Sequence, residues 1–238
     1  DVYFSKISTG NFNESTATIY ADHSLLTANQ EIGIEVERVF QQLKNPYTPL
    51  IFKKLTISPF GVRNLFIRLI NNEMNNKKAG KSAWMLLKFN SLTDEKLVRK
   101  LYRASQTGVK IKIICRGICV LIPGIKGLSE NIEVISIVDK YLEHSRVFEF
   151  ANNGKPLFFI SSADWMNRNL DHRYEVVCPV YDPALQKELH EVLQIQLSDN
   201  RKARLVNSGK VNVYKNAGNS ESPVRSQLDI YDYLHAKS

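Results

Sequence analysis

Residues 141–165 read YLEHSRVFEFANNGKPLFFISSADW, and this stretch predicts a β-hairpin. Two apolar runs flank Asn153-Gly154, a dipeptide typical of two-residue turns between antiparallel strands. With that turn, position 152 pairs with position 155, and the same register places Arg146 opposite Ser161. The hairpin therefore gives a fixed point from which the rest of the sheet can be traced.

Polar side chains gather at the open end of this hairpin. The predicted register places His144 opposite Ala163, and because side chains two apart on a strand share a face, His144 and Arg146 should project together. The groups expected beside the imidazole are the hydroxyls of Ser161 and Ser162 and the carboxylate of Asp164. One histidine among five is more often structural than catalytic. A histidine, a guanidinium and hydroxyls around one point nevertheless suit the handling of a phosphoryl group.

Strands and helices alternate over most of the chain. Strands are predicted at residues 50–57, 83–89, 109–115, 132–138, 145–150, 156–161 and 173–177, and helices at 35–43, 60–78, 93–106, 183–197 and 224–236. Asp182 and the proline after it are typical of a helix start. This alternation predicts an α/β fold with a mixed or largely parallel sheet flanked by helices.

Three segments follow from this pattern. Residues 1–45 are too short for an independent core and begin within an apparent strand without a methionine, so we expect the tail of an upstream domain. A proline-marked linker then leads into the main domain, residues 46–208. Residues 209–238 form a C-terminal tail with a short helix, preceded by an Asn/Ser/Gly-rich stretch at 216–222 that we expect to be mobile.

The composition favours anionic partners. The 238 residues carry 32 Lys and Arg against 24 Asp and Glu, a formal net charge of +8, which suits polyphosphate, nucleotides, nucleic acid or an anionic membrane. Three cysteines cannot all pair, which suits a reducing compartment. No apolar run is long enough to span a membrane. We expect a cytoplasmic location, with peripheral attachment to the inner face of the membrane left open.

Three further residues are candidates for ligand binding. Arg116 follows the predicted strand at 109–115, where ligand sites of open α/β sheets gather, and a guanidinium can clamp phosphate oxygens. Tyr20 could stack on a nucleobase, and Arg168 follows the hairpin close to the expected site. The structural alternatives are a surface arginine at a strand end, an aromatic core residue and a charged residue in a loop.

Several segments, taken in order, resemble the C-terminal part of the long-chain polyphosphate kinases. They are STGNFNE at 8–14 with TA at 16–17, SLLTA at 24–28, RGIC at 116–119 with LIP at 121–123, SIVD at 136–139 with YLEH at 141–144, and SSADWM at 161–166. The resemblance spans about Tyr3 to Arg204. It implies the end of one catalytic domain and nearly all of the last, each similar in fold to half of the phospholipase D superfamily.

The same resemblance implies a reaction. The family moves the terminal phosphoryl group of ATP reversibly onto polyphosphate through a phosphohistidine, with Mg2+. The phosphorylated histidine and the magnesium ligands are expected upstream of Asp1, so this chain has no metal site of its own and should bind polyanions without turning over. His144 matches the second active-site histidine, Arg116 the phosphate-clamping arginine and Tyr20 the adenine-stacking tyrosine.

Further expectations concern partners. Arg146, Ser161, Ser162 and Arg168 are the expected polyphosphate contacts. The partners are ATP or ADP and polyphosphate, without a specific nucleic acid, and the intact protein is expected to be a homo-oligomer.

Two alternatives stay open from the sequence. The first is a phospholipase D-like phosphodiesterase, whose His-x-Lys element appears here as His144-x-Arg146 and whose Gly-Ser-x-Asn element appears around Ser161. The arginine, and the missing aspartate four residues later, argue against it. The second is a non-enzymatic module that binds nucleic acid or another polyanion. Its electrostatic footprint would be Lys77, Lys78, Lys81, Arg201, Lys202 and Arg204.

Overall fold

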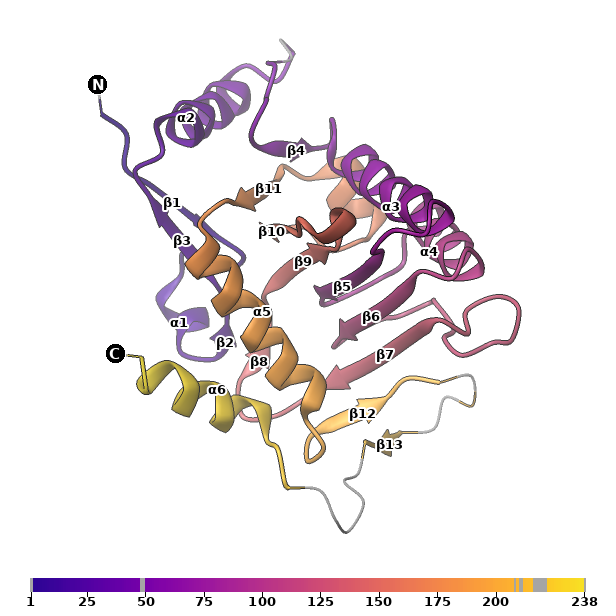
Figure 1. Ribbon diagram of the computed structural model, residues 1–238. Coiled ribbons are helices and arrows are strands. Elements are labelled where there is room, and N and C mark those ends of the chain that lie inside the picture. Colours follow the sequence, from indigo (N-terminus) through magenta and orange to yellow (C-terminus); the bar gives the residue numbers. More distant parts are fainter. Residues whose placement is uncertain (1, 48–49, 208, 210–211, 216–221, 238) are drawn as a thin grey trace.

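A large mixed sheet organises the computed structural model, which describes residues 2–47, 50–207, 209, 212–215 and 222–237 (Figure 1). Within these residues, nine strands follow the order β13-β12-β7-β6-β5-β9-β10-β11-β4. The strands are β4 (Thr56–Ser58), β5 (Trp84–Phe89), β6 (Lys110–Cys115), β7 (Ile132–Ile137), β9 (Arg146–Phe150), β10 (Leu157–Ser161), β11 (Glu175–Val180), β12 (Ala203–Leu205) and β13 (Val213–Tyr214). Only β5, β6 and β7 pair in parallel, and the other neighbours are antiparallel. The predicted α/β fold with a mixed sheet is confirmed.

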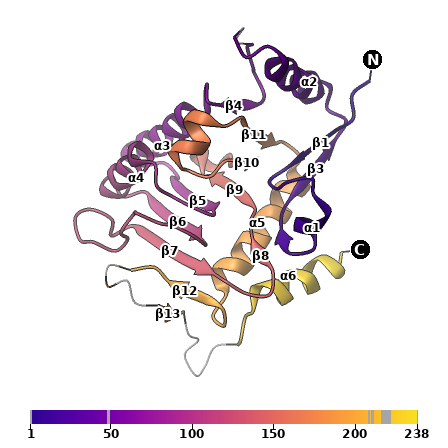
Figure 2. The same ribbon diagram turned by 180° about the vertical axis from the view of Figure 1, so that it is seen from behind.

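Helices cover both faces of this sheet, as Figures 1 and 2 show. On one face, α3 (Val62–Lys78) and α4 (Glu95–Gln106) pack over an aromatic core in which Phe66, Phe148 and Trp165 are fully buried. On the other face, α5 (Pro183–Ser198) packs over the aliphatic side chains of the same strands. Asp182 caps α5 by accepting bonds from the second and third amides after it, as predicted.

The N-terminal segment lies beside one edge of the large sheet. It contains β1 (Ser5–Ser8), α1 (Glu14–Ala17), β2 (Tyr20–Ala21), β3 (Ser24–Thr27) and α2 (Gln30–Lys44). Strands β1 and β3 form an antiparallel ribbon, whereas β2 pairs in parallel with β8 (Leu142–Glu143), immediately before β9. The pairing of β2 with β8 holds the ribbon next to the start of β9. The last helix, α6 (Ser226–His235), lies against α5.

The hairpin prediction is confirmed in its register. Arg146 pairs with Ser161, and the amide of Lys155 donates to Asn152 O at 3.2 Å, which closes the predicted turn. Asn153 and Gly154 both have positive φ, at 55° and 81°, as a two-residue hairpin turn requires.

Several element limits differ from the predictions. The strand expected at 50–57 shrinks to β4, because the amides of Lys53, Lys54 and Leu55 donate to the buried carboxylate of Glu35 instead of to a neighbouring strand. The strand expected at 173–177 is shifted to β11, and α2 begins at Gln30 rather than at residue 35. Residues 216–221 of the stretch expected to be mobile lie outside the described residues. Among the helices that the structure describes, none has the length and apolarity that a membrane span needs.

Candidate active site

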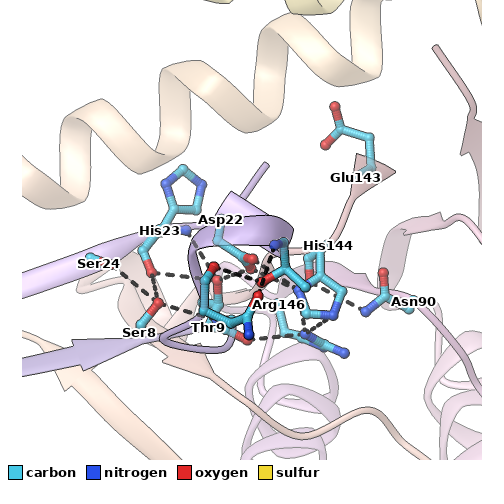
Figure 3. A network of polar contacts seen from close by, with 12 residues as sticks. Ser8, Thr9, Asp22, His23, Ser24, Asn90, Glu143, His144 and Arg146 are labelled. Atoms are coloured by element: carbon cyan, nitrogen blue, oxygen red, sulfur yellow. Dashed lines mark hydrogen bonds and ion pairs between the residues drawn. The ribbon is translucent and has the colours of Figure 1, made fainter. Parts of the chain in front are cut away.

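One edge of the sheet collects the candidate residues. Strands β5, β6 and β10 end there and β9 begins there, so Asn90, Arg116, Asp164 and Arg146 follow or open strands at the same edge. His144 lies just before β9. The ribbon of β1 and β3 with the β2 segment faces this edge and adds side chains from the far N-terminal part of the chain (Figure 3). Figure 3 shows Asn90, His144 and Arg146 joined to Thr9 and Asp22 in one polar network.

His144 is paired with a carboxylate that the sequence interpretation missed. Its Nδ1 lies 2.9 Å from Oδ2 of Asp22, and the two side chains keep 15% and 18% of their surfaces exposed. The hydroxyl of Thr9 donates to the other oxygen of Asp22 at 2.6 Å. Burial by itself raises the pKa of Asp22, but the bonds from His144 and Thr9 outweigh it and hold that pKa below its ordinary value. An ionised carboxylate can only accept, so Nδ1 carries the shared proton and Nε2 is left for other partners.

The predicted pairing of His144 with Ala163 is wrong. The ladder between β9 and β10 stops at Arg146 and Ser161, and the amide of His144 instead donates to Ala21 O at 3.1 Å. The backbone of His144 thus belongs to the pairing of β2 with β8. This difference explains how the imidazole reaches Asp22, which comes from the N-terminal segment.

Arg146 lies beside the imidazole, as predicted. Its Nη1 is 3.3 Å from Nδ1 and 3.2 Å from Nε2 of His144, and it donates to Thr9 O at 3.0 Å. Its Nε and Nη2 reach the two oxygens of Asp164 at 3.3 Å and 3.1 Å. Asp164 also accepts from the amides of Asn90 and Ser91, so it reaches the imidazole only through Arg146. Arg146 is 7% exposed, and all three nitrogens of its guanidinium have protein partners.

Arg116 is held at the end of β6 with part of its guanidinium free. Its Nε donates to Glu143 O at 2.9 Å, and Nη2 donates to Oδ1 of Asn90 at 3.1 Å. Nη1 has no hydrogen-bond partner among the described residues. The amide group of Asn90 in turn donates to His144 O at 3.2 Å. Asn90 therefore connects the backbone of His144 to the guanidinium of Arg116. Like Arg116, Asn90 directly follows a buried strand, but the sequence interpretation used this signal only for Arg116.

Tyr20 forms one wall beside the histidine. Its ring centroid lies 4.7 Å from that of His144, with the planes tilted by 49°. Tyr20 and Asp22 also line a polar pocket of about 400 Å³, to which α1 contributes as well. The other side chains of the pocket come from β1, β3, α1 and the loop before α1, among them Lys6, Ser8, Asn11 and Asn13. A flat ligand group could lie against Tyr20 with its anionic end toward His144.

Three predicted contacts make no hydrogen bond to the imidazole within the described part of the chain. The hydroxyl of Ser161 donates to Val176 O at 3.0 Å, and that of Ser162 to the carboxylate of Glu175 at 2.5 Å. Both hydroxyls thus tie β10 to β11, and neither is bonded to His144. Arg168 begins a short π-helical segment and is exposed. Their role as polyphosphate contacts stays a prediction.

The described side chains do not form a metal centre. Among them, no group of three or more His, Cys, Asp or Glu could hold a metal ion. The three cysteines are free, and Cys115 and Cys119 lie near each other beside Arg116. We therefore derive no chemical step through a metal from this chain.

Two family models match the chain in succession. "Polyphosphate kinase C-terminal domain 1" matches residues 2–49, and "Polyphosphate kinase C-terminal domain 2" matches residues 55–227. The curated polyphosphate kinase of Vibrio parahaemolyticus is 52% identical over 98% of this chain and 33% of its own length. That of Escherichia coli K12 is 46% identical over 98% of the chain and 34% of its own length. The chain thus spans about a third of the length of the curated relatives it matches.

A solved structure matches the fold over nearly the whole chain. The crystal structure of polyphosphate kinase from Porphyromonas gingivalis covers 98% of this chain with a TM-score of 0.93 and 48% sequence identity, using 36% of its own chain. The N-terminal ribbon and the large sheet therefore occur together in a known relative.

Proposed function

The chain belongs to the polyphosphate kinase family, and we propose that it is the C-terminal part of an enzyme that reversibly transfers the terminal phosphoryl group of ATP to polyphosphate. The observation that carries this proposal is the contact of His144 with Asp22, Arg146 and Tyr20 beside Arg116. These groups combine a proton-transfer side chain, fixed positive charge and an aromatic wall. Phosphoryl transfer depends on such positioning and charge neutralisation.

His144 acts on the phosphoryl group in transit. Asp22 fixes the proton on Nδ1 and orients the ring, as a carboxylate does for a catalytic histidine in hydrolase triads. Nε2 lies 3.2 Å from Nη1 of Arg146, and when it carries a proton it can donate a hydrogen bond or that proton to a phosphoryl oxygen. The ring does not carry the covalent phosphate, because the family resemblance assigns that role to a histidine that precedes Asp1.

Arg116 and Tyr20 hold the nucleotide. Since Nε and Nη2 of Arg116 are fixed by Glu143 and Asn90, its remaining Nη1 can meet a phosphate oxygen without a further loss of side-chain freedom. Tyr20 offers its ring to adenine at the edge of the polar pocket. Arg146 supplies charge beside the imidazole, and its full set of protein partners suits a fixed electrostatic role better than a mobile contact.

The remaining parts of the reaction come from outside this chain. Residues 1–45 close a preceding catalytic domain, residues 46–208 form nearly all of the last, and residues 209–238 are a tail. The phosphorylated histidine and the ligands of Mg2+, which supplies charge neutralisation on ATP when bound, come from the preceding part. The full-length enzyme is a cytoplasmic homo-oligomer, and the isolated chain binds polyphosphate without turnover.

The test is phosphorus NMR of the full-length enzyme with Mg2+ and ATP. We expect a growing resonance of internal phosphoanhydride units together with release of ADP. His144→Ala should lower the rate at least about 100-fold without unfolding the protein. His172→Ala is the control, because His172 is an exposed histidine away from this network. Normal turnover by the His144 variant, or cleavage of an added phosphodiester with ATP unchanged, would overturn the proposal.

A further inference from the structure

A second cluster of polar side chains lies on the side of β8 that faces α5, away from the His144 imidazole. Glu143 precedes His144, and its side chain points to the opposite side of β8, toward α5 (Figure 3). Its carboxylate forms an ion pair of 2.6 Å with Lys88 of β5, and both side chains are only 3% exposed. Burial by itself raises the pKa of Glu143, but Lys88 and two glutamine amides outweigh it, so the group is held ionised.

The C-terminal helix reaches into this cluster through Gln227. Its amide nitrogen donates to Oε1 of Glu143 and to Tyr141 O, both at 2.8 Å. Its side-chain oxygen accepts the amide of Tyr141 at 2.9 Å. Gln196 of α5 donates to the other oxygen of Glu143 at 2.7 Å. Gln227 therefore binds the backbone just before β8 and the carboxylate on β8, with three hydrogen bonds in all.

The strand that Gln227 holds is the one that presents the candidate active-site groups. The carbonyl of Glu143 accepts from Nε of Arg116, and the next residue is His144. The amides of Leu142 and His144 donate to Ile19 O and Ala21 O, on either side of Tyr20, at 2.9 Å and 3.1 Å. A shift of β8 would therefore move the histidine, the arginine and the tyrosine relative to one another.

We propose that Gln227 of α6 is a positioning residue for phosphoryl transfer, because it fixes β8 so that His144 and Arg116 meet the same phosphoryl group. This proposal rests on the proposed function. Gln227 touches neither the histidine nor the arginine and acts through Glu143 and the β8 backbone. The C-terminal helix is thus part of the catalytic framework, although it lies on the side of β8 away from the imidazole.

A matched control separates this role from simple attachment of the helix. Asn200 holds the segment that leads into α6, since it accepts the amide of Val224 at 2.8 Å and donates to Ser222 O at 3.0 Å. It makes no bond to β8. Gln227→Ala and Asn200→Ala both remove side-chain bonds to the C-terminal segment, but only the first removes bonds to the active-site strand.

The experiment measures turnover and amide exchange in the full-length enzyme. For Gln227→Ala we expect kcat to fall about tenfold or more, because small displacements of reacting groups have large effects on rate. Hydrogen–deuterium exchange at residues 142–145 should become about tenfold faster, since these amides report the pairing of β2 with β8. Asn200→Ala should leave kcat and the exchange rate at residues 142–145 within about twofold of the wild-type values, although exchange in α6 itself increases. Gln227→Met, of similar size, replaces the alanine variant if that variant does not fold.

The outcomes distinguish the two proposals. Unchanged exchange at 142–145 in the Gln227 variants, or equal loss of kcat in the Gln227 and Asn200 variants, overturns the positioning role. If the wild-type enzyme forms no polyphosphate, the proposed function fails. The exchange data then decide by themselves whether Gln227 positions β8.

Discussion

Two ion pairs involve the consecutive residues Glu143, the last of β8, and His144, which follows it, and they differ in how completely they are enclosed. The side chains of Lys88 and Glu143 are each 3% exposed, and both oxygens of the Glu143 carboxylate accept hydrogen bonds from the protein. The pair of His144 and Asp22 keeps 15% and 18% exposure and borders an open polar pocket. The first pair is shut off from any ligand, whereas the second borders the pocket and lies near Nη1 of Arg116, which has no hydrogen-bond partner among the described residues. Two consecutive residues thus form one enclosed ion pair and one that borders the pocket.

The largest effect on the rate is expected from removing the charge of Asp22, in the partly exposed pair of His144 and Asp22. Asp22→Asn keeps the size of the side chain but lets its amide donate to the imidazole, which favours the wrong tautomer of His144. We expect the rate of polyphosphate synthesis by the full-length enzyme to fall about 100-fold to 1000-fold with little loss of stability.

A matched control for Asp22→Asn is available on the same sheet. Glu149 of β9 also pairs with a histidine, His190 of α5, at 2.9 Å, but away from the pocket. Glu149→Gln should leave the rate within about twofold, since it alters a histidine–carboxylate pair that does not border the site. Equal losses of rate in the two variants would contradict the assignment of Asp22 as the orienting carboxylate.

The second effect concerns the enclosed pair of Lys88 and Glu143, and it lowers the free energy of unfolding. Lys88→Met leaves the ionised carboxylate of Glu143 buried without its cation, so we expect a loss of about 3–5 kcal/mol in the free energy of unfolding. Adding Glu143→Gln should recover most of that loss, because the neutral amide needs no counter-charge. Urea denaturation followed by tryptophan fluorescence measures both variants.

A different ion pair, on the surface of α4, offers the control for this stability effect. Arg99 and Glu95 form a surface ion pair on α4, with 72% and 75% exposure. Arg99→Ala should therefore change the free energy of unfolding by less than about 1 kcal/mol. If Lys88→Met were equally mild, the buried pair would not be the support that its enclosure suggests.

The sequence predicted the secondary structure and the hairpin register better than it predicted the partners of either ion pair. The helices, the hairpin register and the place of Arg116 follow from local periodicity and a turn dipeptide, which act within about 20 residues. The bond from Arg146 to Thr9 spans 137 residues, and that from His144 to Asp22 spans 122. Such contacts depend on how the N-terminal ribbon docks, which periodicity does not encode.

The errors have the same origin. His144 was assigned to the β9–β10 ladder because the pattern of alternation continues through it, whereas the backbone there pairs with β2. The strand at 50–57 was lost to the carboxylate of Glu35 for a similar reason. In both places a distant segment competes with the local partner for the same amides. Tyr20 is a candidate both from its aromatic ring and from the family resemblance, and the structure places its ring beside that of His144.

The smallest effect comes from displacing the exposed carboxylate without removing it. Gly10 packs so closely that a Cβ there would lie 1.9 Å from Oδ2 of Asp22, so the side chain must move in Gly10→Ala. Because the carboxylate is the end of a side chain rather than backbone, it can yield, and the fold should persist. We expect the rate to fall about tenfold, which is less than in Asp22→Asn, through a weaker bond to His144.

A double-mutant cycle shows whether Gly10→Ala acts through that carboxylate. In an Asp22→Ala background there is no carboxylate left to displace, so Gly10→Ala should change the rate by less than about twofold. The coupling between the two sites should then account for nearly all of the tenfold effect. An undiminished tenfold loss in the Asp22→Ala background would mean that Gly10 is needed for another contact of the loop before α1. The position of the Asp22 carboxylate would then matter less for the rate than its charge.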